Sequence, residues 1–194
     1  MEMKLINAEV LNDRIYKDMK KQFPPEELKS FNAINDLLTG GKYKLDLLII
    51  NGHDAGYILY YKSDFLWIDY IAILPEYQSC GLGSKVLQLF FDKYKMLKGC
   101  YFEVEKENPQ DKNTIRRVKF YKRNGCEVLD FKYYFPNDVK LLEMDLYYKN
   151  LSGVLPAKTR ILEDIEEIFG CLHVQTQSCM EILELIKKEN KCGS

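Results

Sequence analysis

Three strand-like runs stand close together near the middle of the chain, and they constrain its fold more than any other feature. The runs are YKLDLLII, GYILYYK and FLWIDYIAIL, at residues 43–50, 56–62 and 65–74, and they are rich in β-branched and aromatic side chains. The connections NGHDA and SD have turn compositions. The sequence therefore predicts an antiparallel meander, with His53 in its first turn as a solvated loop residue.

Helices and further strands surround this meander. The expected elements are a strand at 4–10, helices at 12–23, 24–41 and 84–97, a strand at 100–108, a helix at 113–124, and strands at 126–135 and 140–149. The helix at 24–41 is expected to open with its prolines, and the helix at 84–97 to continue until Gly99. This order is typical of a mixed α/β domain, which we place at residues 1–150.

Residues 151–194 differ in character from the rest of the chain. They contain two amphipathic helices, at 159–173 and 178–193, and the second is expected to open with a capping box of Ser178 and Glu181 and to close at Gly193. We interpret this segment as a C-terminal helical extension that packs on the main domain or forms the contact of a homodimer.

The composition argues against several classes of partner. The 28 basic and 29 acidic side chains leave a formal net charge of −1, so no global field gathers nucleic acid or an anionic membrane. The 6 cysteines include no Cys-x-x-Cys pair, and with only 2 histidines we expect reduced thiols and no metal site. No run of about 18 uncharged apolar residues occurs. We therefore expect a cytoplasmic protein.

Two glycines in the stretch PEYQSCGLGSKV, Gly81 and Gly83, stand between the third strand of the meander and the next helix. A dinucleotide-binding fingerprint would need a third glycine where the chain has Val86, and a Walker loop would need a different spacing before Lys85. The layout itself, a strand, a turn with close backbone approach and a helix N-terminus, suits a phosphate or pyrophosphate. It also serves any tight turn from strand to helix.

The residues around these glycines carry a resemblance to a known family. The stretch IDYIAILPEYQSCGLGSKVL resembles the acyl-CoA site of the GNAT N-acetyltransferases, whose Arg/Gln-x-x-Gly-x-Gly/Ala motif is here Gln78 to Gly83. Downstream, YFEVEKEN and FYKRNGCEV resemble the next strand and helix of that family, so that the resemblance covers about residues 4–150. Ser79 and Cys126 depart from the usual glycine and phenylalanine, and the connection 105–113 is longer than in many members.

This resemblance implies a fold, a cosubstrate and the residues that hold it. The fold is a mixed, mostly antiparallel central sheet flanked by helices, splayed between the strand that ends at Leu74 and the strand that contains Glu103. The cosubstrate is acetyl-CoA, without a metal, and its pyrophosphate lies at the glycines. The implied cofactor-binding residues are Ile71, Ala72, Ile73, Gln78, Ser79, Cys80, Gly81, Leu82, Gly83 and Ser84.

Transfer of an acetyl group to an amine needs a base for the amine and an acid for the departing thiolate. Strand alternation puts Tyr101, Glu103 and Glu105 on one face of their strand, and we expect Glu105 to face solvent. Glu103 matches the glutamate that acts as the base in members of this family, and Asp69 is the second carboxylate candidate for that role. Tyr121 matches the tyrosine that protonates the coenzyme A sulfur. Each also has an ordinary structural interpretation, as a solvated carboxylate or a half-buried helical tyrosine.

These residues predict an N-acetyltransferase in which a primary amine attacks acetyl-CoA directly. The alternative is a non-catalytic acyl-CoA-binding or regulatory module. Such a module could have lost either Glu103 or Tyr121, so the presence of both residues favours the enzyme. The sequence does not select the acceptor, which is a small-molecule or a peptide amine.

Overall fold

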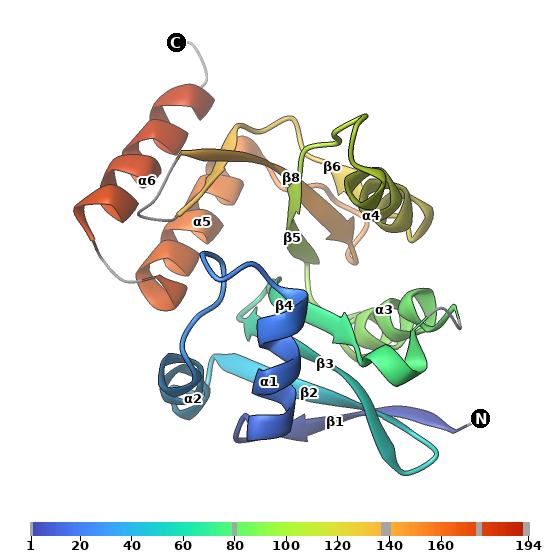
Figure 1. Ribbon diagram of the computed structural model, residues 1–194. Coiled ribbons are helices and arrows are strands. Elements are labelled where there is room, and N and C mark those ends of the chain that lie inside the picture. The colour runs from blue at the N-terminus through green and yellow to red at the C-terminus, as the bar shows by residue number, and fades with distance from the viewer. Residues whose placement is uncertain (1, 79–80, 137–140, 174–175, 192–194) are drawn as a thin grey trace. The chain divides into compact units, whose positions relative to one another are not determined.

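The computed structural model describes residues 2–78, 81–136, 141–173 and 176–191, which form two compact units, residues 1–100 and 101–194. Helices and mostly antiparallel strands make up both units (Figure 1), so that the mixed α/β class is confirmed. The boundary between the units falls at the start of the fifth strand. The division into domains at residue 150 stays a prediction.

The first unit contains the predicted meander. Its strands are β1 (Met3–Ala8), β2 (Tyr43–Ile50), β3 (His53–Lys62) and β4 (Leu66–Ile73), and each pairs with the next in antiparallel register. Nearly every β3 side chain from Ala55 to Tyr61 is buried, as expected for a central strand with both faces covered. His53 is exposed as expected, but it begins β3 and pairs with Ile50 instead of lying in the turn.

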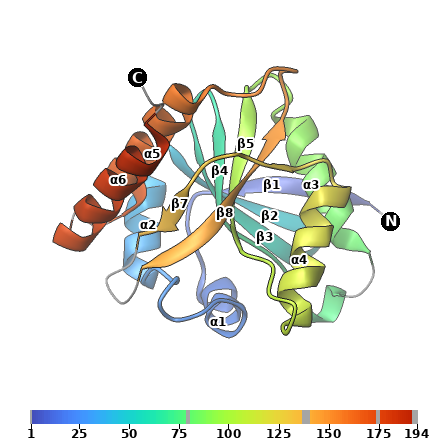
Figure 2. The same cartoon turned by 90° about the horizontal axis from the view of Figure 1, so that it is seen from above.

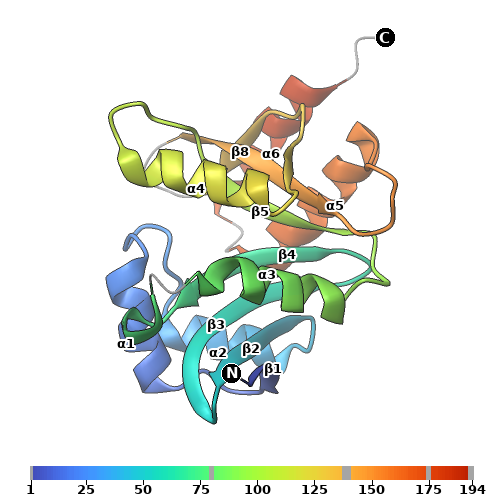
Figure 3. The ribbon, with the colours of Figure 1, turned by 90° about the vertical axis from the view of Figure 1, so that its right-hand side faces the viewer.

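Helices cover both faces of this sheet. They are α1 (Asp13–Gln22), α2 (Phe31–Thr39) and α3 (Leu82–Lys93), with the short 3-10 helix η1 (Pro75–Tyr77) before α3. On β3, the hydroxyl of Tyr57 donates to Asp18 of α1, whereas the ring of Tyr60 contacts Phe90 of α3 at 4.8 Å between centroids. The two tyrosines point to opposite faces of the strand, so α1 and α3 lie on opposite sides of the sheet (Figure 3).

Two helix boundaries differ from the prediction. The second helix begins at Phe31 and not at the prolines, because the Ser30 hydroxyl accepts a hydrogen bond from the Ala33 N–H at 3.2 Å and caps the helix there. The chain from Pro24 forms turns before that point. Helix α3 ends at Lys93, well before Gly99, and the next residues form turns in which the Leu97 N–H donates to the Tyr94 carbonyl.

A buried carboxylate fastens the end of α3 to the sheet. Asp46 of β2 is 0% exposed, and its Oδ2 lies 2.6 Å from the Lys93 ammonium. Close by, the hydroxyls of Tyr60 and Tyr94 share a hydrogen bond. Burial first, and then the charge of Asp46, raise the pKa of Tyr60 far above its usual value, so this hydroxyl stays protonated. The ion pair of Asp46 and Lys93 places charge in a buried region, where removal of one partner lowers the free energy of unfolding.

Asp46→Asn should lower the free energy of unfolding by about 2–4 kcal/mol, because it removes the charge opposite Lys93 and leaves a buried amide in its place. The cost is limited because Lys93 reaches solvent. Urea denaturation measures it. Asp92→Asn, at an exposed carboxylate of the same helix, is the control and should change stability by no more than about 0.5 kcal/mol. Equal effects of the two variants would show that the buried pair is energetically unimportant.

The second unit is built around the strand that carries Glu103. Its strands are β5 (Gly99–Glu105), β6 (Glu127–Val128), β7 (Tyr133–Phe135) and β8 (Leu142–Asn150), and β8 lies beside β5, β6 and β7. Helix α4 (Lys112–Arg123) precedes β6 as predicted. The predicted strand at 126–135 is instead two short strands. Between the two strands, the Leu129 N–H donates to the Leu146 carbonyl of β8, and the Phe131 N–H donates to the Leu129 carbonyl in a turn.

The two C-terminal helices belong to the same compact unit. They are α5 (Lys158–Leu172) and α6 (Gln177–Asn190), and they lie side by side (Figure 2). Asp164 of α5 accepts a hydrogen bond of 2.7 Å from the Tyr101 hydroxyl of β5. The N-cap of α6 is Thr176 and not Ser178, since the Thr176 hydroxyl accepts from the Cys179 N–H at 3.1 Å. Helix α6 ends at Asn190, and Gly193 lies outside the described residues.

No helix in the described ranges combines the length and the apolar character that crossing a membrane requires. The cysteines in those ranges, Cys100, Cys126, Cys171 and Cys179, are free thiols.

Candidate active site

The implied cofactor-binding residues begin at the end of β4. Ala72 is buried opposite Tyr57 of β3, whereas Ile71 and Ile73 are half-buried. Ile73 pairs with Gly56 of β3. The two strands approach so closely there that a Cβ added to Gly56 would lie 2.5 Å from the carbonyl oxygen of Ala72. This contact fixes the path of β4 just before the chain turns toward α3.

The turn that follows places the start of α3 near the end of β4. The side-chain amide of Gln78 donates to the Ile73 carbonyl at 2.9 Å and to Gln22 Oε1 at 3.3 Å. Gly81 is the N-cap of α3, with a left-handed φ of 68° that favours glycine. Because Gly81 has no side chain, it cannot cap the first N–H groups of the helix, and these groups suit an anion.

The other implied cofactor-binding residues are placed as follows. Leu82 begins α3 and is buried, and Gly83 and Ser84 stand half-buried in the first turn of the helix. Ser79 and Cys80 lie outside the described residues.

Asp69 occupies an irregular position in β4. Leu59 of β3 pairs with Tyr70 and Tyr60 pairs with Ile68, so Asp69 is the extra residue of a β-bulge. The bulge lets Asp69 and Tyr70, which are neighbours in the chain, both interact with the segment before α2. The Tyr70 hydroxyl donates to the Glu27 carbonyl at 2.7 Å and accepts from the Lys29 N–H at 3.0 Å.

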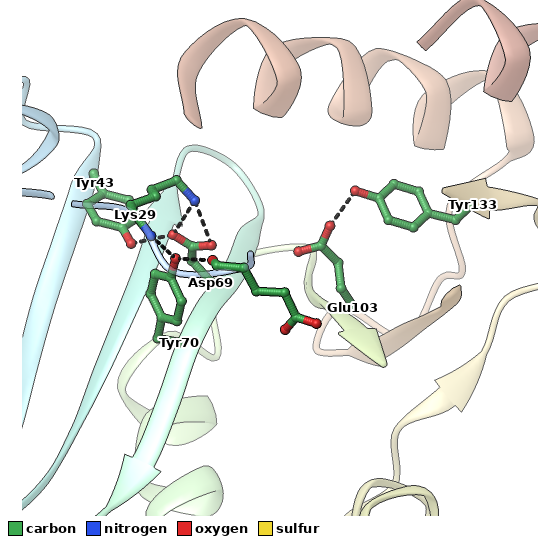
Figure 4. Close-up of polar contacts among 7 residues, drawn as sticks. Lys29, Tyr43, Asp69, Tyr70, Glu103 and Tyr133 are labelled. Carbon is green, nitrogen blue, oxygen red and sulfur yellow. Dashed lines mark hydrogen bonds and ion pairs between the residues drawn. The ribbon is translucent and has the colours of Figure 1, made fainter. Parts of the chain in front are cut away.

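The carboxylate of Asp69 is already well satisfied (Figure 4). Its side chain is 6% exposed, and the Lys29 ammonium lies 3.0 and 2.9 Å from its two oxygens. The Tyr43 hydroxyl donates to Oδ2 at 2.5 Å. Burial and the charge of Asp69 hold the pKa of Tyr43 well above its usual value, so Tyr43 stays a donor. Both oxygens of Asp69 are therefore engaged by partners from its own unit.

Glu103 has different surroundings in the second unit. It is half-buried on β5, and its Oε1 accepts a hydrogen bond from the hydroxyl of Tyr133 on β7 (Figure 4). Glu105, two residues further along the strand, pairs with Arg117 of α4, and its side chain is 36% exposed, as expected. The donor from Tyr133 is a neutral hydroxyl, whereas Asp69 is held by the ammonium of Lys29.

Tyr121 lies on the other side of β5. It stands on α4, is 8% exposed, and packs its ring against Phe102 at 5.0 Å and Tyr147 at 5.9 Å between centroids. Because Phe102 and Glu103 are neighbours on a strand, Tyr121 and Glu103 lie on opposite faces of β5. An acid and a base at these places would serve different atoms of a substrate.

Cys126 replaces an aromatic residue without adding a nucleophile. Its side chain is buried behind Tyr121, whose carbonyl accepts the Cys126 N–H at 3.1 Å. Burial raises the pKa of the Cys126 thiol to about 12, so the thiol is neutral and behaves as a small apolar group.

Comparison with known proteins identifies what this arrangement belongs to. Residues 12–125, more than half of the chain, match the sequence profile of the acetyltransferase (GNAT) family. The chain belongs to the GNAT family. The matched segment includes β4, α3, β5 and α4, on which the predicted GNAT site residues stand, and it ends before β7.

Individual GNAT relatives match over most of the chain. YjbC of Bacillus subtilis (strain 168), provisionally named an acetyltransferase, is 25% identical over 190 residues, which cover 90% of this chain and 95% of YjbC. A Bacteroides thetaiotaomicron structure provisionally assigned to the GNAT family is 21% identical, with a TM-score of 0.73 over 89% of this chain and 98% of its own. A Bacillus subtilis acetyltransferase in complex with CoA is 15% identical, with a TM-score of 0.58 over 77% of this chain and 99% of its own.

These matches confirm the predicted GNAT family and fold. Membership of this family implies acyltransferase activity. In the described ranges no group of three or more His, Cys, Asp or Glu side chains could hold a metal ion.

Three residues that contact the GNAT candidates were not predicted from the sequence, namely Lys29, Tyr43 and Tyr133. They come from elements distant in the chain from the carboxylates that they contact. No motif marks any of them, and Tyr43 and Tyr133 are two of 14 tyrosines. Tyr133 and its neighbours also lie beyond the segment that matches the GNAT profile.

Proposed function

We propose that the protein is an N-acetyltransferase that moves an acetyl group from acetyl-CoA to a primary amine by direct attack. The observation that carries this proposal is the left-handed Gly81 at the start of α3, the first α-helix after β4, in a chain of the GNAT family. The chain retains a carboxylate and a tyrosine where the family's mechanism uses them, Glu103 and Tyr121.

The cofactor side of the proposal rests on the first unit. The backbone from Ile71 to Ile73 receives the acyl-carrying arm of acetyl-CoA, and the backbone N–H groups from Ser79 to Ser84 receive its pyrophosphate. The geometry of Gln78 supports this, because its amide holds the Ile73 carbonyl and thereby links the two parts. The positive end of α3 and its uncapped N–H groups stabilise negative charge. No metal takes part.

The proposed reaction transfers the acetyl group in one direct step from sulfur to nitrogen. The nitrogen of the acceptor attacks the thioester carbon, the new C–N bond forms and the C–S bond breaks. Glu103, directly or through a water, accepts the proton that the amine loses, and the Tyr121 hydroxyl gives a proton to the departing thiolate. Asp69, whose carboxylate is paired with Lys29, remains a second candidate for the base. The acceptor is a small-molecule or a peptide amine.

Two measurements test the function as a whole. Acetyl-CoA should raise the melting temperature of the protein whereas ATP should not, and at least one member of a panel of small amines and peptides should release free CoA thiol in the presence of acetyl-CoA. Stabilisation by acetyl-CoA without turnover across the panel would favour a non-catalytic acyl-CoA-binding or regulatory module. An unchanged melting temperature in the presence of acetyl-CoA, without turnover, would contradict both the enzyme and the non-catalytic module.

Gly83→Val should weaken acetyl-CoA binding by about 1–3 kcal/mol, or about 5- to 150-fold in Kd, since a β-branched side chain in the first turn of α3 crowds the pyrophosphate and costs an N–H contact. Isothermal titration calorimetry measures the affinity. Gly170→Val in α5, where a Cβ meets nothing within 4 Å, controls for the effect of valine on a helix. Unchanged affinity in a folded Gly83→Val variant would place the pyrophosphate elsewhere.

A further inference from the structure

We propose that Tyr133 is a positioning residue for the base Glu103, and that α6 holds Tyr133 in place through Asn190. This inference rests on the proposed function, in which Glu103 accepts the proton of the amine. It assigns a role in the reaction to a part of the chain that lies beyond the match to the GNAT family profile.

The hydrogen bond between Tyr133 and Glu103 joins a fully buried donor to a half-buried acceptor. Tyr133 is 0% exposed, and its hydroxyl donates to Oε1 of Glu103, which is itself only half-buried (Figure 4). A fixed, buried donor therefore holds one oxygen of a carboxylate that still reaches toward solvent. Such a bond restricts the rotation of the side chain and favours its charged form, which is the form that accepts a proton.

Asn190 fixes the backbone next to Tyr133. It is 4% exposed at the last turn of α6, and its Oδ1 accepts from the Lys132 N–H at 2.8 Å. Its amide donates to the Lys132 carbonyl at 2.8 Å and to the Ile186 carbonyl of its own helix at 2.8 Å. The side chain thus satisfies both backbone groups of the residue before Tyr133. Lys132 directly precedes β7, so Asn190 fixes the chain at the start of the strand that carries Tyr133.

The ionisable groups on the elements around β5 and β7 have partners of their own. These contacts are Tyr101 with Asp164, Asp164 with Arg160, Tyr101 with the ring of Tyr148, Glu105 with Arg117, Glu143 with Lys106 and Lys132, and His173 with the ring of Phe135. Removing the hydroxyl of Tyr133 changes no partner in any of these pairs. A shift in the pH profile of such a variant therefore reports the bond to Glu103.

Tyr133→Phe is the direct test. It should lower kcat about 10-fold, leave the KM for acetyl-CoA unchanged, and move the acidic limb of the pH profile of kcat/KM upward by roughly 1 unit, because Glu103 loses a donor that favours its charged form. Tyr134→Phe, at the next residue of β7 on the opposite face, is the matched control and should leave all three quantities unchanged.

A double variant separates this proposal from the assignment of the base. In the Glu103→Gln background, Tyr133→Phe should cause no further shift of the acidic limb. If Glu103→Gln lowers turnover but Tyr133→Phe changes neither kcat nor the pH profile, the positioning role is wrong and the assignment of Glu103 stands. If Glu103→Gln itself turns over like the wild type, the assignment of the base is what fails.

Asn190→Ala tests the contribution of α6. It should lower kcat about 3- to 10-fold and shift the acidic limb in the same direction as Tyr133→Phe, because Lys132 loses both of its contacts to the helix. Lys188→Ala, at an exposed position of the same helix, is the control. A lower melting temperature with an unchanged pH profile would limit Asn190 to a structural role and overturn this part of the proposal.

Discussion

Tyr121→Phe should lower kcat by about 100- to 10,000-fold while the affinity for acetyl-CoA stays within a factor of about two, since the variant loses only the proton donor of the thiolate. The structure favours this separation, because the ring of Tyr121 is fixed by its packing against Phe102 and Tyr147 and a phenylalanine fills the same space. Steady-state kinetics with the best acceptor of the panel, together with calorimetry of cofactor binding, measure the two quantities.

Tyr147→Phe is the matched control for this prediction. Tyr147 is buried beside Tyr121, and burial, followed by the charges of Asp145 and Glu107, raises the pKa of Tyr147 to about 12. A hydroxyl with so high a pKa is a weaker acid than an ordinary tyrosine, so this variant should retain turnover. If Tyr147→Phe lost turnover while Tyr121→Phe kept near wild-type turnover, Tyr147 and not Tyr121 would be the acid that protonates the thiolate.

Local signals predicted the parts of the fold that neighbouring residues determine. The alternation and turn compositions of residues 43–74 gave the meander, because strands joined by short turns pair with their neighbours in the chain. The glycines at 81 and 83 marked the start of α3 within a few residues. The prolines at 24 and 25 misplaced the start of α2, since Ser30 offers a stronger cap further along.

Long-range contacts explain what the sequence left out. The hydrogen bonds that hold Lys132 at the start of β7 come from Asn190, which lies 58 residues away in the chain. The ion pair between Asp69 and Lys29 joins residues that lie 40 apart in the chain. Neither pairing leaves a periodic or local pattern, so composition and spacing could name the carboxylates but could not rank them by their surroundings.

Glu103→Gln should lower turnover by about 100- to 10,000-fold at pH values below the pKa of the acceptor amine. Glutamine keeps the shape of the side chain and can still accept the hydrogen bond of Tyr133, but it cannot take the proton that the amine must lose. As the pH rises toward the pKa of the amine, more of the acceptor is neutral in solution, and the turnover of the variant should recover in part. A pH profile of kcat/KM for wild type and variant measures the recovery.

Glu105→Gln is the control for this second prediction, since Glu105 stands on the same strand and pairs with Arg117 near the surface. Its profile should follow that of the wild type, because an exposed ion pair contributes little to stability and takes no part in the chemistry. If Glu103→Gln also follows the wild type, the proton goes elsewhere and Asp69 becomes the candidate. In that case Asp69→Asn should show the pH-dependent loss of turnover that Glu103→Gln lacks.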